Sequence, residues 1–175
     1  MLRKMRARKI TRKTPLREVL KLGRACAKCG HCCINGSGFL VKHDIKNIAE
    51  YLGMSRKELI KKCLEPVALF NTTLYRPVLV QNGRFRTCIF YDNAAGCTIH
   101  DVKPLQCRVC NCSEYGEELS IWFRLNFFVN PDDAESVRQW KVYLESGGRN
   151  IPGGELHELV PDPVKLKKML NYEVL

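Results

Sequence analysis

Residues 26–33 read CAKCGHCC, so four cysteines stand within eight residues of one another. Their spacing is Cys26-x2-Cys29-x2-Cys32-Cys33. Gaps of two residues allow a tight loop to wrap several thiolates around one metal centre, as in the C-x2-C-x2-C run of bacterial ferredoxins. Cysteines this close together rarely arise for packing alone. We therefore interpret this stretch as one half of a metal site.

The other half of the predicted site lies 55 or more residues downstream, where five further cysteines follow the pattern Cys88-x8-Cys97-x9-Cys107-x2-Cys110-x-Cys112. A single zinc ion held by two C-x2-C pairs is one interpretation, and it would use Cys26, Cys29, Cys107 and Cys110. The chain has ten cysteines, more than one zinc ion consumes. This excess favours one or two iron–sulfur clusters, [4Fe–4S] in type, with zinc as the alternative cofactor. The predicted metal ligands are Cys26, Cys29, Cys32, Cys33, Cys88, Cys97, Cys107 and Cys110.

The adjacent pair Cys32-Cys33 differs from a ferredoxin run, which places its fourth cysteine three residues further on. In an extended segment, neighbouring side chains point to opposite sides, so the two thiols would be poorly placed to share one metal ion. They could bridge two neighbouring centres, or one could face a cluster and the other a core. Cys63, and in part Cys112, are interpreted as buried inert thiols.

The composition bounds the class of protein. The 175 residues are 45% apolar, enough to bury a core. The N-terminal residues MLRKMRARKITRK contain no apolar run of the kind a secretory signal needs. No stretch of about 18 uncharged apolar residues occurs, so a membrane-spanning helix is not expected. We therefore predict a cytoplasmic protein, because free thiolates persist in a reducing compartment.

The charge is concentrated at the N-terminus. Residues 1–28 hold eleven Lys or Arg and one Glu, whereas the other 147 residues hold 18 basic and 17 acidic side chains. Such a basic segment suits RNA, a ribonucleoprotein or an acidic protein partner, although a solvated tail is the alternative interpretation. The candidate nucleic-acid-binding residues are Arg3, Lys4, Arg6, Arg8, Lys9, Arg12 and Lys13.

Apolar periodicity and turn signals predict a small, helix-rich α+β domain with a short β-hairpin. Helices are expected over 15–22, 45–52, 55–64, 132–145 and 164–171, and a strand over 121–129. Asn82-Gly83 lies between two short apolar runs, which is typical of a tight hairpin turn, and the second strand would carry Cys88. We divide the chain into a basic arm ending in a short helix, residues 1–22, and a cysteine-cluster domain, residues 23–175.

The ordered combination of cysteine motifs resembles a known family. Its parts are Cys26-x2-Cys29-Gly30-x-Cys32-Cys33, Cys88-x-Phe90, Gly96-Cys97-x-Ile99-His100 and Pro104-x2-Cys107-Arg108. Together they are similar to the signature of the zinc- or iron-chelating cysteine-cluster family, the YkgJ-like proteins. This chain departs from the family pattern in having Lys103 where an Arg is usual, and Val109-Cys110 where Phe-Pro is usual.

The resemblance implies that seven cysteines form the site: Cys26, Cys29, Cys32, Cys33, Cys88, Cys97 and Cys107. A distant similarity to the flagellin lysine methylases implies that an iron–sulfur cluster is compatible with the motif. Two functions follow as hypotheses: an iron–sulfur redox or accessory subunit, or a zinc-stabilised module that binds RNA or a ribonucleoprotein through its basic arm. The sequence has no evident triad, paired carboxylates or phosphate loop, so no reaction is predicted.

Overall fold

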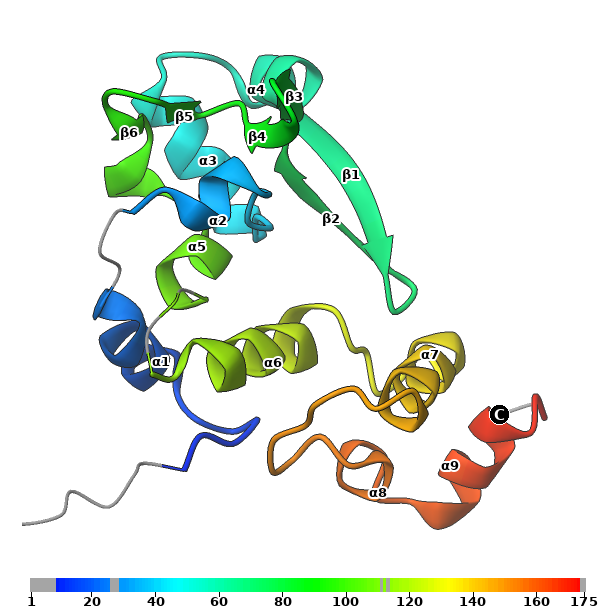
Figure 1. Cartoon of the computed structure of the whole chain (residues 1–175). Coiled ribbons are helices and arrows are strands. Elements are labelled where there is room, and N and C mark those ends of the chain that lie inside the picture. Colours follow the sequence, from blue (N-terminus) through cyan, green and yellow to red (C-terminus); the bar gives the residue numbers. More distant parts are fainter. Residues whose placement is uncertain (1–8, 26–28, 111, 113, 174–175) are drawn as a thin grey trace, which may run out of the picture.

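The computed structural model describes residues 9–25, 29–110, 112 and 114–173. It confirms a small α+β fold made mostly of helices, with short antiparallel strand pairs (Figure 1). In chain order the elements are α1 (Leu16–Leu22), η1 (Gly23–Ala25), α2 (His31–Ile34), α3 (Lys42–Tyr51), α4 (Arg56–Cys63), β1 (Leu64–Leu69), β2 (Thr72–Pro77), β3 (Leu79–Asn82), β4 (Phe85–Cys88), β5 (Tyr91–Asp92), β6 (Gly96–Cys97), η2 (His100–Val102), α5 (Leu105–Val109), α6 (Gly116–Phe127), α7 (Ala134–Glu145), α8 (Leu156–Leu159) and α9 (Pro163–Leu170).

The part of the chain that carries most of the cysteines, residues 29–102, is called here the cysteine lobe. Its small core forms where α3 and α4 bury Ile48 and Leu59 against Ile99. The start of α4 is fixed by the predicted capping box, since the Ser55 side chain accepts a hydrogen bond from the Glu58 amide and the Glu58 carboxylate accepts one from the Ser55 amide. These short helices form the frame to which the strands are attached.

Three hairpins build the rest of the cysteine lobe among the described residues: β1–β2, β3–β4 and β5–β6. The predicted hairpin is confirmed, but its turn is Gly83-Arg84, one residue later than expected, since Asn82 pairs with Phe85. Gly83 has a φ of +59°, and β4 ends at Cys88. The hairpin β1–β2 was not predicted. Its turn, Phe70-Asn71, contains no glycine, yet both residues have positive φ, of 50° and 56°. Pro66, two residues beyond the helix expected over 55–64, lies within β1.

The larger core lies among the remaining helices and buries Trp140, Phe123 and Phe128 almost completely. The strand predicted over 121–129 is wrong, because helix α6 runs through Phe127. Helix α6 is buried on several sides, so its apolar residues show neither a clean helical period nor a strict alternation. Its aromatic and branched residues then favoured the strand interpretation.

The described beginning of the chain packs on this larger core. Ile10 is buried in it, and the Arg12 amide donates a hydrogen bond to the Pro152 carbonyl at 2.8 Å. The Trp122 indole N–H donates to the Thr14 carbonyl at 2.9 Å. Arg3, Lys4, Arg6 and Arg8, four of the candidate nucleic-acid-binding residues, lie outside the described residues. Lys9 and Lys13 are exposed, and Arg12 is half-buried.

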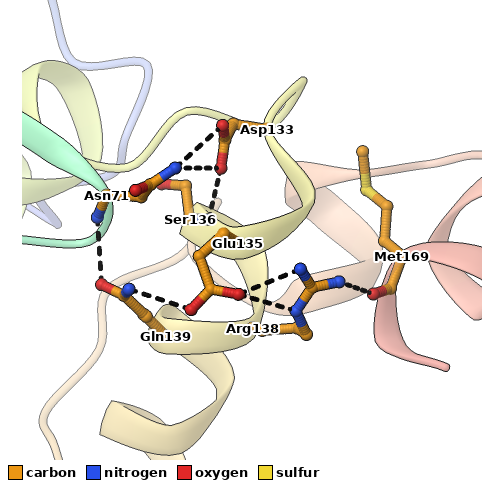
Figure 2. A network of polar contacts seen from close by, with 7 residues as sticks. All are labelled: Asn71, Asp133, Glu135, Ser136, Arg138, Gln139 and Met169. Atoms are coloured by element: carbon orange, nitrogen blue, oxygen red, sulfur yellow. Dashed lines mark hydrogen bonds and ion pairs between the residues drawn. The ribbon is translucent and has the colours of Figure 1, made fainter. Parts of the chain in front are cut away.

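The tip of β1–β2 connects the cysteine lobe to the C-terminal helices (Figures 1 and 2). The Asn71 side-chain amide donates to the Asp133 carboxylate at 3.1 Å. The backbone N–H of Asn71 donates to the Gln139 side-chain oxygen at 3.0 Å. Beside it, the Phe70 ring packs edge-on against Trp140 at a centroid distance of 5.3 Å. The hairpin therefore connects the two cores through these contacts. Among the described residues, no helix has the length and apolar character needed to cross a membrane.

Candidate metal centre

One cavity of about 480 Å³ gathers the cysteines that the sequence spreads over more than eighty residues. Eight of the nine described cysteines line it: Cys29, Cys32, Cys33, Cys88, Cys97, Cys107, Cys110 and Cys112. The ninth, Cys63, lies half-buried on α4 and is not part of the lining. Cys26, a predicted ligand, lies outside the described residues.

The adjacent pair Cys32-Cys33 sits on a helical turn, α2, and not in an extended segment. The expectation that the two thiols point to opposite sides is therefore wrong, because a helical turn separates neighbouring side chains by about 100°. Gly30 directly precedes α2 and has a φ of +74°, a left-handed conformation that glycine adopts without strain. A β-carbon at Gly30 would lie 2.6 Å from the Tyr91 hydroxyl, so only glycine fits there.

Two hairpins supply the next wall of the cavity. Strand β4 delivers Cys88, which is 8% exposed, and β6 delivers Cys97 directly after Gly96 at φ +76°. The loop between β5 and β6 is shaped by Asp92, whose carboxylate accepts hydrogen bonds from the Ala94 and Ala95 amides at 2.8 and 2.7 Å. Sequence spacing alone could not show that these two cysteines face one another, since a loop separates their strands.

Helix α5 carries Cys107 to the opposite wall, where the backbone of Gly38 passes directly over the sulfur. A β-carbon at Gly38 would coincide with Cys107 Sγ, so the close approach requires glycine. A β-carbon at Gly36, two residues earlier, would lie 3.7 Å from its nearest neighbour, the Cys32 carbonyl oxygen, so this position does not require glycine. The Phe39 amide, next along the chain, donates to Gln106 Oε1 at 2.7 Å and fixes the loop to α5.

Asp44 joins the two halves of the site. It is 1% exposed, and its carboxylate accepts hydrogen bonds from the amides of Val41 at 3.0 Å and Leu105 at 2.8 Å. The Arg108 guanidinium donates a further hydrogen bond to the Asp44 carboxylate, at 3.1 Å. Asp44 was expected to cap the helix that follows it; it lies in the first turn of α3 and also holds α5, the helix of Cys107, in place. We call this set of contacts the Asp44 clasp.

Five thiols of the cavity, among them the exposed Cys32, influence one another's protonation. The hydrogen bond from the Cys33 thiol to the Cys32 sulfur, helped by the Lys103 ammonium, lowers the pKa of Cys32 to about 6. The same bond and burial raise the pKa of Cys33. Burial, together with the negative charge of neighbouring thiolates, raises the pKa of Cys88 to about 11 and also raises that of Cys107. These thiols interact because Cys32, Cys33, Cys88, Cys97 and Cys107 form one inner group.

The other three thiols have different surroundings. Cys29 and Cys112 are both exposed, and the Cys112 thiol is hydrogen-bonded to Cys29, which raises the pKa of Cys112. Cys112 was interpreted in part as an inert buried thiol, but the structure places it at the cavity beside a predicted ligand. Burial raises the pKa of Cys110 to about 12, although Ser120 hydrogen-bonds its sulfur and Arg124 lies nearby. The sequence set Cys112 apart, and the family resemblance left out Cys110, but nothing in the sequence distinguished Cys29 from the inner group.

The cavity and its donors can be compared with what each metal requires. Within the described residues, no three His, Cys, Asp or Glu side chains converge so that they could hold a metal ion. The thiols line the walls of a cavity instead, and soft thiolates are the ligands of zinc and of iron–sulfur clusters. A tetrahedral zinc ion holds its sulfur ligands at about 2.3 Å. The donor set fits either metal chemistry.

A comparison with protein families assigns the chain to a class. The family model CxxCxxCC, described as "Putative zinc- or iron-chelating domain", matches residues 25–133. This is well over half of the 175 residues, and the chain belongs to that family. The matched segment contains the whole cavity and ends at Asp133, the residue directly before α7. Comparisons with curated proteins and with solved structures gave no match.

Proposed function

We propose that this protein binds an iron–sulfur cluster in the cysteine-lined cavity. One observation carries the proposal: eight cysteines from five separate segments line a single cavity of about 480 Å³. A cluster needs about four thiolate ligands spread around several irons, whereas a zinc site draws four ligands to a point. The inner group provides five thiols, so a complete ligand set exists without the exposed pair Cys29 and Cys112.

The proposed ligands are those predicted from the sequence, and they differ in how strongly each is supported. Cys32, Cys33, Cys88, Cys97 and Cys107 are supported by their mutual contacts, and Cys26 and Cys29 by the family motif. Cys110 is the weakest of the predicted ligands, since Ser120 hydrogen-bonds its sulfur. A buried cluster of this kind suits electron transfer or an accessory role in a larger system, working in a reducing compartment such as the cytoplasm.

The metal is tested by purifying the full chain without oxygen and measuring iron, zinc and acid-labile sulfide. We expect a brown protein with iron and sulfide in equal amounts, near four of each per chain for a single [4Fe–4S] cluster. The absorption should bleach on reduction with dithionite. A colourless protein that holds zinc and no sulfide would sink the iron–sulfur proposal and favour the zinc alternative.

A pair of cysteine variants tests the location. Cys107→Ser should lose most of the bound iron, because its sulfur lies in the inner group against Gly38. Cys63→Ser is the matched control, since this thiol lies on α4 away from the cavity. Equal iron and sulfide content in the two variants would show that the cluster lies elsewhere.

A second candidate function rests on the eleven Lys or Arg among residues 1–28. We propose that this basic arm, residues 1–22, contacts RNA or a ribonucleoprotein, with the cysteine domain of residues 23–175 as a metal-stabilised anchor. Such binding would come mainly from phosphate contacts and would weaken steeply with salt. Replacing Arg3, Lys4, Arg6 and Arg8 by Gln should then reduce the salt dependence of RNA binding, and an unchanged salt slope would refute the role of the arm.

A further inference from the structure

The charge outside the basic arm is divided between the two parts of the molecule. Residues 29–88 carry nine Lys or Arg and four Asp or Glu, whereas residues 89–175 carry nine basic and thirteen acidic side chains. A near-neutral total therefore conceals an excess of basic side chains in residues 29–88, the greater part of the cysteine lobe. Because this excess sits on a folded surface, it can form a binding site of defined shape, unlike a charged tail.

All four acidic residues of the segment 29–88 are already engaged. Asp44 is in the clasp, Glu50 pairs with Lys46, Glu58 with Lys62, and Glu65 with Arg76. Six exposed cations have no ion pair within the described residues: Lys42, Arg56, Lys57, Lys61, Arg84 and Arg86. Five of the six lie on α4 or on the β3–β4 hairpin, which occupy the same end of the molecule (Figure 1).

An aromatic ring stands among these cations at the tip of the hairpin. Phe85 is 53% exposed and lies between Arg84 and Arg86. Its partner across the hairpin is Asn82, and Val80, on the same face, is 42% exposed. A large ring so exposed contributes little to a core. The hairpin tip thus presents an exposed aromatic ring with an arginine on each side of it along the chain.

The exposed ring faces away from the cavity. Side chains alternate along a strand, so Phe85 and Thr87 point to one side of β4, and Arg86 and Cys88 to the other. Cys88 lines the cavity. The Phe85 face is therefore separate from the metal centre, and a ligand bound on it would not need to displace a thiol.

We infer that the β3–β4 hairpin tip, together with the exposed cations of α4 at the same end of the molecule, binds single-stranded RNA. Aromatic rings flanked by cations bind single strands by stacking on bases while the cations contact phosphates. Duplex RNA hides its bases, whereas loops and single strands present them. Asn82, exposed at the tip, offers its side-chain amide to base edges, whereas the Gln81 side-chain amide already donates to the Gly83 carbonyl at 2.6 Å. This surface is distinct from the basic arm, which would add phosphate contacts only.

The inference is tested with the full-length, metal-loaded chain and a fluorescently labelled single-stranded RNA of about ten nucleotides, the span that one such module covers. Phe85→Ala should weaken binding at least about fivefold, the lower end of what one stacked base contributes. Arg84→Gln with Arg86→Gln should reduce the slope of log affinity against log salt by about 1.4. Matched controls are Tyr172→Ala, an aromatic residue 77% exposed at the other end of the chain, and Lys167→Gln on α9.

Two comparisons separate base stacking from nonspecific apolar or electrostatic binding. Phe85→Trp should retain binding and Phe85→Leu should lose it, because leucine keeps apolar area but has no π-face. Equal affinity of these two variants, equal binding of a duplex of the same sequence, or a Phe85→Ala variant that binds like the Tyr172→Ala control would each overturn the inference. Iron, zinc and sulfide are measured on every sample, so a failure of the metal proposal is seen separately.

Discussion

The Asp44 clasp makes a quantitative prediction about what holds the site together. Asp44→Ala removes a carboxylate that is 1% exposed and leaves the Leu105 amide, the Val41 amide and the Arg108 guanidinium without their acceptor. Hydrogen bonds to a charged group contribute about 1.5–3 kcal/mol each, and removing one partner of a buried ion pair costs about 3–5 kcal/mol. The three bonds share one carboxylate and are not additive. We therefore expect a loss of about 4 kcal/mol in the free energy of unfolding.

This loss is large against a total stability of about 5–15 kcal/mol. It is measured by urea unfolding of anaerobic protein, first metal-depleted and then loaded, with two spectroscopic probes to check for a single transition. Because the clasp positions α5, the same substitution should also speed the loss of metal to a chelator. Asp44→Asn should lose less free energy of unfolding than Asp44→Ala but remain less stable than the wild type. The asparagine amide keeps the shape of the carboxylate, but its NH2 group would face the N–H donors that the carboxylate accepts from.

The matched control is Asp132→Ala, which removes an exposed carboxylate paired with Lys165 at 2.8 Å. Exposed pairs of this kind contribute about 0–1 kcal/mol. If Asp44→Ala unfolds within about 1 kcal/mol of the wild type and releases metal at the same rate as the control, the clasp does not support the site and the reasoning from burial is refuted.

Three further predictions use other contacts. Gly38→Ala should reduce metal content because a β-carbon would meet the Cys107 sulfur, whereas Gly36→Ala, with 3.7 Å of clearance, should bind metal normally; metal analysis of both variants checks this. Phe70→Ala should cost about 3–5 kcal/mol in urea unfolding because its ring is 5% exposed in the larger core, against less than about 1 kcal/mol for Phe85→Ala. In metal-free protein the Cys88 pKa of about 11 exceeds its ordinary value of 9.0, so the folded form keeps the proton longer. Its stabilising contribution should be complete below pH 9.0 and lost as the pH rises to about 11, which unfolding at stepped pH with Cys88→Ala as reference would detect.

The elements with local signals could be predicted from the sequence. The capping box at Ser55 and Glu58 and the hairpin indicated by Asn82-Gly83 each depend on residues a few positions apart. Both occur, although the hairpin turn lies one residue later, at Gly83-Arg84. The hairpin β1–β2 could not be predicted, because its turn at Phe70-Asn71 owes its positive φ values to tertiary contacts. Asn71 is held by Asp133 and Gln139, more than sixty residues away.

The site was predicted as a set of residues, but not as an arrangement. Cysteine spacing identified the thiols that line the cavity, with Cys112 undervalued because a single cysteine two residues beyond a C-x2-C pair has no pattern of its own. The relation between Cys32 and Cys33 was misjudged because a helical turn of four residues is too short to show periodicity. Phe85 was interpreted only as a strand residue, since its exposure depends on where the hairpin docks.

The cavity is closed by protein contacts as well as by the metal it would hold. Cysteine spacing predicts that metal binding closes the fold by joining segments some 60–80 residues apart. The structure adds two joints made by the protein itself: the Asp44 clasp, from α3 to α5, and the hairpin tip at Asn71, from the cysteine lobe to α7. Since both act without metal, the walls of the cavity are held near one another before the metal arrives. A preformed cavity lowers the entropy cost of binding, and close packing at Gly30 and Gly38 therefore matters as much as the thiols.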